Sequence, residues 1–209
     1  HPLCRRQRQM CIRDRYKSEN FQINLWLVSL MSIILLMIIV GGLTRLTESG
    51  LSMVDWRLFM GTIPPLSHGD WLKVFEDYKQ YPEYQIKNIN MTLSEFKYIF
   101  WWEYGHRVLG RLIGIIFIIP FIYFALKKYF SNEELYSYSF LLFLGGAQGI
   151  IGWWMVKSGL DVNPYVSHLR LAVHLIIAQI ILSLIAYLFL KRLDTVSYTH
   201  LRAHETLQH

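Results

Sequence analysis

Four long apolar runs constrain the fold of this chain more than any other feature. The runs are 25–43, 108–126, 135–156 and 171–190, and each approaches or exceeds the roughly 20 apolar residues that cross a bilayer. Their only charged or histidine residues are Arg111 and His174. A soluble four-helix bundle is the alternative, but its helices would need a polar face toward water, which these runs lack. The sequence therefore predicts an all-α integral membrane protein, a four-transmembrane-helix bundle with spans at about 25–43, 106–126, 135–156 and 170–190.

Both ends of the chain differ in composition from its middle. Residues 1–15 hold five Arg, no Lys and both cysteines, and residues 194–209 hold three of the eight histidines. We expect these two segments to be non-native, adapter-like sequence, with a disordered basic arm as the alternative at the N-terminus. The remaining domain, 16–193, contains no cysteine, so it offers neither a disulfide nor a thiolate site.

A long polar segment, 44–97, separates the first two spans and is rich in Trp, Tyr and mixed charge. This composition suits a folded loop at the membrane surface. Thr92 and Glu95 have capping-box spacing, which predicts that the second helix begins before the membrane. Basic residues at 127–128 and 191–192 favour a cytoplasmic or matrix N-terminus, which leaves the long loop outside.

Two histidines stand out at membrane depth, where ionisable groups are candidates for function. His106 lies about one turn from the start of its apolar run, His174 lies about one turn inside its own, and the two spans run in the same direction. Facing imidazoles across a bundle core ligate haem iron axially. Hydrogen-bonded packing is the alternative for either histidine alone. A catalytic zinc site fits less well because it needs three protein ligands.

Charged residues accompany this histidine pair. Arg107, Arg111 and Arg170 lie at the outer rim, where guanidinium groups suit the propionates of a haem. Glu103 is three residues before His106 and therefore on the same helix face. It is a candidate for proton handling, against the alternative of an ordinary interfacial carboxylate. His168 is six residues from His174, so these two histidines cannot serve one site together.

Four sequence patterns resemble motifs of the haem A synthase family, of the mitochondrial and α-proteobacterial type, and occur in the same order. They are GGLTRLTESGLSM at 41–53 (followed by Trp56 and Pro64-Pro65), WEYGHRVLGR at 102–111, QGIIGWWMVKSGL at 148–160 and RLAVHL at 170–175. The resemblance covers roughly residues 20–192. A first-loop cysteine pair of some bacterial relatives is absent.

The resemblance implies an oxidoreductase that converts a methyl group of haem O to a formyl group, making haem A for cytochrome oxidase. It implies eight spans in two related four-helix halves, of which this chain is the N-terminal half. His106 and His174 then match the iron ligands of that half, and Glu103 matches the family's functional glutamate. The bound group would be haem O as substrate or haem b.

The resemblance also suggests the setting of the protein. We expect a multi-pass protein of the bacterial inner membrane, with the mitochondrial inner membrane as the alternative. Expected partners are membrane lipid, haem O synthase, an electron donor, cytochrome oxidase assembly factors and a second copy of the chain, with no nucleic acid. Two other functions stay open from the residues: a b-type bis-histidine electron-transfer cytochrome, and a small transporter or assembly subunit without a cofactor.

Overall fold

The computed structural model describes the backbone of residues 2–54, 62–161 and 164–205 and the side chains of 19–54, 62–161 and 164–193. The element order is α1 (Pro2–Leu46), α2 (His68–Lys79), the π-helical turn η1 (Glu83–Lys87), α3 (Leu93–Leu126), α4 (Asn132–Leu160) and α5 (His168–Glu205). Trp56 of the first-loop pattern lies outside the described residues.

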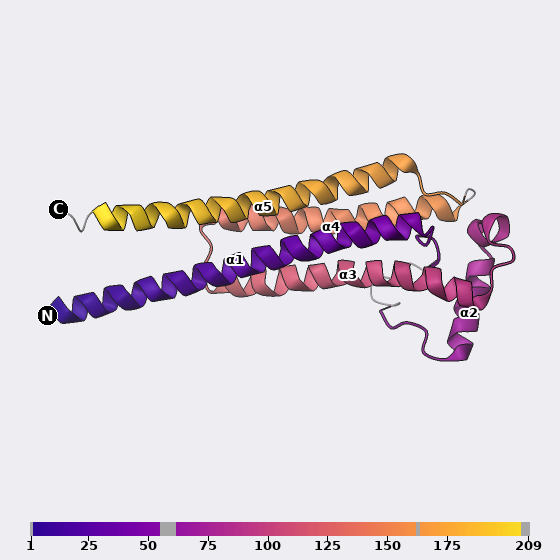
Figure 1. Cartoon of the computed structure of the whole chain (residues 1–209), viewed down its shortest axis with the longest axis horizontal. Coiled ribbons are helices and arrows are strands. Elements are labelled where there is room, and N and C mark those ends of the chain that lie inside the picture. Colours follow the sequence, from indigo (N-terminus) through magenta and orange to yellow (C-terminus); the bar gives the residue numbers. More distant parts are fainter. Residues whose placement is uncertain (1, 55–61, 162–163, 206–209) are drawn as a thin grey trace.

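The four long helices run antiparallel to their chain neighbours and form one elongated bundle (Figure 1). Both chain termini lie at one end, here called the terminal end, and α2 and η1 cap the other, here called the loop end. Helix α1 packs on α3 and α5, and α4 packs on α5 and α3, so α3 and α5 occupy one diagonal and α1 and α4 the other.

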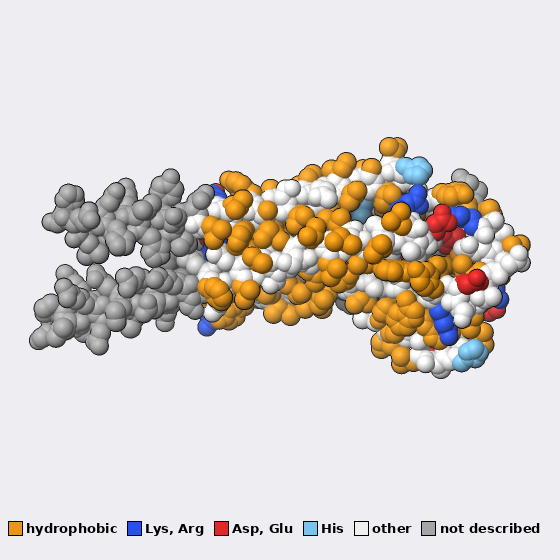
Figure 2. All heavy atoms as spheres, viewed as in Figure 1, with side chains coloured by type: hydrophobic (Ala, Val, Ile, Leu, Met, Phe, Trp, Pro, Cys, Tyr) orange, Lys and Arg blue, Asp and Glu red, His pale blue; other side chains and the backbone are white. Residues whose placement is uncertain are grey.

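Each long helix contains a segment long and apolar enough to cross a membrane. These segments are Glu19–Leu46, Leu93–Leu126, Asn132–Leu160 and His168–Leu193, and each predicted span falls inside one of them. Large apolar side chains remain exposed along the flanks of the bundle (Figure 2). Since such surface is unfavourable in water and suits lipid, the predicted fold class, an all-α membrane bundle, is confirmed.

The helix starts follow from local capping chemistry. The predicted box at Thr92 is confirmed: its hydroxyl accepts from the Glu95 N–H at 3.4 Å, and the Glu95 carboxylate accepts from the Thr92 N–H at 2.8 Å. Ser131 starts α4 and Ser67 starts α2 in the same way. These boxes satisfy backbone donors that a helix start leaves unpaired.

Packing inside the bundle is centred on Trp26 of α1. Its indole N–H donates to the Ile116 carbonyl of α3 at 2.9 Å, and its ring meets Phe117, Phe124 and Tyr138 edge-on. At the terminal end, Arg192 of α5 pairs with Glu134 of α4 and donates to Asn20 of α1 at 2.6 Å. These contacts fix the register of α1, α4 and α5.

The long loop folds against the outward extension of α3. A second buried cluster joins loop and helix; it consists of Met53, Trp71, Phe75, Tyr78, Phe96, Ile99 and Phe100. The Tyr104 hydroxyl also donates to the Thr62 carbonyl at 2.6 Å. The loop is therefore a small packed unit, and it brings residues 49–53 back onto α3.

Candidate haem-binding site

Glu103 lies at the junction of α3 and the long loop. Its side chain is almost fully buried, and it accepts four hydrogen bonds. Two come from the loop, from the Ser52 hydroxyl and the Met53 N–H, both at 2.8 Å. Two come from Arg107 one turn along α3, from Nε at 3.0 Å and Nη2 at 2.5 Å. Four donors match an ionised carboxylate, which only accepts.

Arg107 completes this junction rather than facing outward. Besides its pair with Glu103, its guanidinium donates to the Met53 carbonyl at 2.8 Å. The backbone of Met53 is thus held at both polar groups: its N–H donates to Glu103, and its carbonyl accepts from Arg107. Glu103 and Arg107 together clamp the start of the loop onto α3, one turn from His106.

His106 lies directly against helix α1. A Cβ added to Gly41 would lie 3.1 Å from His106 Nε2 and 3.4 Å from Cδ2. The imidazole therefore occupies space on the α1 surface that any other residue at position 41 would fill. His106 is half-buried among these helices.

His174 has the corresponding arrangement with helix α4. A Cβ added to Gly152 would lie 3.1 Å from His174 Cε1. Gln148, one turn away on α4, donates from Nε2 to the His174 carbonyl at 2.8 Å and fixes α5 at this height. Nδ1 of His174 is buried without a hydrogen-bond partner among the described residues.

The two histidines share one level of the bundle. They project from α3 and α5, the diagonal pair, in the half nearer the loop end, and each lies against a glycine of the other diagonal. His168, in contrast, is an exposed residue at the first position of α5. The structure thus brings His106 and His174 together and leaves His168 apart.

The other two predicted arginines have separate surroundings. Arg170 lies at the loop end, where its guanidinium donates to the Trp154 carbonyl at 2.8 Å and stacks 4.4 Å from the Trp154 ring centroid. Arg111 is half-buried in α3, one turn deeper than Arg107. The structure thus places Arg170 against α4 at the loop end and Arg111 deeper along α3.

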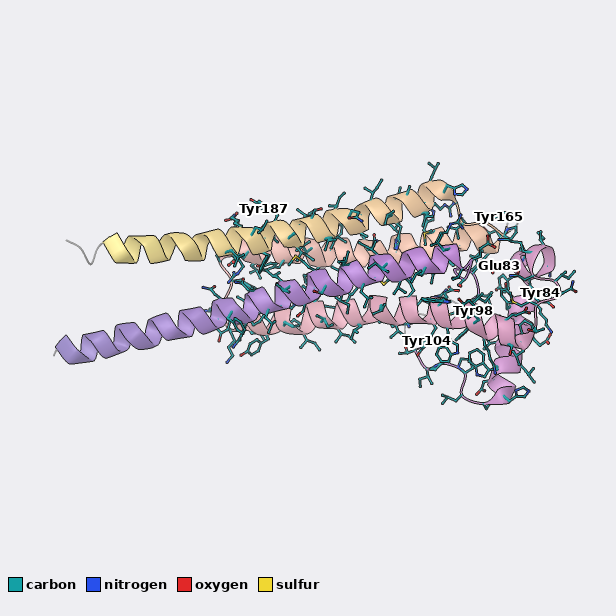
Figure 3. All side chains as sticks on the ribbon, in the orientation of Figure 1. Glu83, Tyr84, Tyr98, Tyr104, Tyr165 and Tyr187 are labelled. Atoms are coloured by element: carbon teal, nitrogen blue, oxygen red, sulfur yellow. The ribbon has the colours of Figure 1, made fainter. Side chains whose placement is uncertain are left out.

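A second buried carboxyl group, Glu83, was not singled out from the sequence. It lies in η1 beside Tyr84 (Figure 3) and accepts from the Tyr78 hydroxyl at 3.0 Å, which in turn accepts from Asn88 Nδ2 at 2.8 Å. Burial raises the pKa of Glu83 from its usual 4.5 to about 7, and the Tyr78 hydrogen bond opposes part of this rise. No motif marks it, because its burial results from the loop's tertiary packing.

The residues at the histidine level fit a haem. Two imidazoles on diagonal helices would supply nitrogen ligands that a haem iron accepts. The flanking glycines remove side-chain bulk beside both rings, and Nδ1 of His174 is buried without a hydrogen-bond partner among the described residues. A group so orphaned costs stability unless something else satisfies it.

Comparison with known proteins agrees with this chemistry. The family model described as "Cytochrome oxidase assembly protein" matches residues 24–208. The heme A synthase of Bradyrhizobium diazoefficiens is 51% identical over 156 residues, 75% of this chain and 43% of that protein. Those of Flavobacterium psychrophilum and Rickettsia bellii are each 51% identical, over 78% and 79% of this chain and 48% and 49% of theirs. No solved structure matches.

The matches cover most of this chain but less than half of each relative. The chain therefore spans slightly under half the length of the curated relatives it matches. Its four patterns, its membrane bundle and its histidine pair lie within the matched region. The chain belongs to the haem A synthase family of cytochrome oxidase assembly proteins.

Proposed function

We propose that this chain forms the N-terminal four-helix part of a haem A synthase, an enzyme that oxidises a methyl group of haem O to a formyl group. The observation that carries the proposal is the placement of His106 and His174 on the diagonal helices α3 and α5, each against a glycine of the other diagonal. Relatives named heme A synthase support the same activity.

His106 and His174 would hold the haem iron through their imidazole nitrogens. The bound haem, either haem O as substrate or a haem b, would supply the redox-active iron and the porphyrin methyl group. The protein's contribution is to fix the ring position, to exclude water with the apolar bundle, and to place charge at the loop end. Arg111 and Arg170 would pair with the propionates, as guanidinium groups suit carboxylates.

Glu103 is the candidate catalytic group. Four donors hold its carboxylate in place one turn from His106. Of the two roles open to it, accepting a proton and stabilising positive charge that develops near the reacting carbon, this geometry favours the second. Accepting a proton would require breaking the pair with Arg107. Arg107 would hold Glu103 in place and contact a propionate only by leaving that pair.

The membrane setting follows from the same relatives. The chain is a multi-pass membrane protein, and its bacterial relatives favour the bacterial inner membrane. Haem O synthase, an electron donor, cytochrome oxidase assembly factors and a second copy of the chain remain proposed partners.

The experiment is to express the complete protein that carries this chain, together with a source of haem O, and to analyse the extracted haems by chromatography. Haem A should accumulate with the parent and be lost with His106→Ala and His174→Ala. His168→Ala, whose side chain is exposed at the first position of α5, is the control and should retain activity. If only haem with an intact methyl group were recovered from the parent, the protein would be an electron-transfer cytochrome instead.

A further inference from the structure

Gly41 and Gly152 differ from the other described glycines in what lies opposite them. Each faces a histidine ring. A Cβ added at Gly41 would lie 3.1 Å from His106, and a Cβ added at Gly152 would lie 3.1 Å from His174. The other glycines of the transmembrane helices either meet nothing within 4 Å or, at Gly110 and Gly159, meet an aliphatic side chain or backbone. Close helix packing alone therefore does not explain these two positions.

The two contacts complete a four-sided arrangement at one level. The histidines project from α3 and α5, one diagonal of the bundle, and the glycines belong to α1 and α4, the other diagonal. Each imidazole lies on the neighbouring helix surface where a Cβ is missing. The backbone of a neighbouring helix thus limits the orientations that each imidazole ring can adopt.

From this arrangement we propose that Gly41 and Gly152 are positioning residues that seat the two axial imidazoles. The inference rests on the proposed haem site. A methyl group at either position would force the ring to move by a few tenths of an ångström. A ligand's orientation and basicity depend on its surroundings, and disturbing them typically costs about 10- to 100-fold in metal affinity.

Gln148 supports the same function on the α4 side. Its hydrogen bond to the His174 carbonyl fixes the height of α5 relative to α4, so that His174 and Gly152 stay opposite each other. No side chain makes the equivalent bond to the His106 carbonyl among the described residues. On that side, the clamp of Glu103 and Arg107 on Met53 fixes the chain just after α1.

The chain provides matched controls for this proposal. Gly42 follows Gly41 on α1, and Gly149 lies one turn before Gly152 on α4, yet an added Cβ meets nothing within 4 Å at either. Alanine is a better helix former than glycine. A defect found in Gly41→Ala or Gly152→Ala but absent from Gly42→Ala and Gly149→Ala therefore cannot come from a change in helix stability.

The first test reads the haem itself. The 209-residue chain and these four variants are placed in membranes with haem, and haem affinity, midpoint potential and low-spin EPR g values are recorded. We expect Gly41→Ala and Gly152→Ala to lose about tenfold in affinity and to shift both the potential and the g values. The two controls should match the parent. Equal behaviour of all four variants would overturn the proposal.

The second test does not depend on haem. Thermal unfolding is compared for Gly41→Ala, His106→Ala and the double variant, and likewise for Gly152→Ala with His174→Ala. Each glycine variant should lower the melting temperature while its histidine is present and should not lower it once that histidine is alanine. Additive effects would refute the ring contact. A parent that shows this coupling but binds no haem would overturn the proposed function and leave the contact standing.

Discussion

Replacing Glu103 by Gln should release the loop from α3 at a cost that the structure allows us to estimate. The substitution keeps an oxygen that can accept from Ser52 and Met53 but removes the charge that faces Arg107. Breaking a buried pair from one side costs about 3–5 kcal/mol, because the remaining charge stays buried. Arg107, only 13% exposed, keeps its bond to the Met53 carbonyl, so we expect the lower end, about 3 kcal/mol.

For a chain of this length, that loss corresponds to a melting temperature lower by roughly 6–12 °C. The assay is thermal unfolding in detergent, combined with hydrogen exchange at residues 49–53, which should accelerate. Glu76→Gln is the control, because its pair with Lys79 is solvent-exposed and such pairs contribute at most about 1 kcal/mol. A Glu103→Gln protein that melts with the parent and protects 49–53 equally would refute the clamp.

Three further substitutions test other parts of the structure. Burial raises the pKa of Glu83 from 4.5 to about 7, so the folded state binds the proton more tightly than the unfolded state. The free energy of unfolding should therefore fall by up to roughly 3 kcal/mol as pH rises from about 4.5 to 7. Glu83→Gln should flatten that slope in pH-dependent unfolding, and an unchanged slope would exclude Glu83 as its source. Trp26→Phe loses the hydrogen bond to the Ile116 carbonyl and should lower unfolding free energy by about 1 kcal/mol, whereas no loss in denaturant titration would contradict that bond. Gln148→Leu removes the bond to the His174 carbonyl but also removes a buried Oε1 that has no partner among the described residues. It should therefore lower the free energy of unfolding by less than about 1 kcal/mol while still shifting the haem spectrum. A large stability loss with an unchanged spectrum would refute its positioning role.

The bundle could be predicted from the sequence because it depends on local properties. Apolar length sets the spans, and the spacing of Thr92 and Glu95 sets the start of α3 before the membrane. The matching depth of His106 and His174 on parallel spans stays a prediction of a shared site.

The contacts of Glu103 with the loop could not be predicted from the sequence. Three-residue spacing groups Glu103 with His106 on one helix face, and the four-residue spacing of Glu103 to Arg107 is the signal for their ion pair. Its other partners, Ser52 and Met53, are about fifty residues away through the long loop. Only the packed loop brings them together, and no periodicity encodes that.

The glycine contacts were equally hidden. Glycines in membrane helices usually permit close helix approach, and the sequence contains several with the same appearance as Gly41 and Gly152. Which of them faces a histidine depends on the rotation of α1 and α4 about their axes. That rotation is set by packing across the whole bundle, including the Trp26 cluster.

The most direct measurement of the central claim is the reduced-minus-oxidised spectrum of this chain in membranes supplied with haem. The parent should give a low-spin signal of a haem with two imidazole ligands, and His106→Ala and His174→Ala should each abolish it. His168→Ala is the control and should leave the signal intact, because His168 is exposed at the start of α5. A low-spin signal that survives both His106→Ala and His174→Ala would contradict the bis-histidine site.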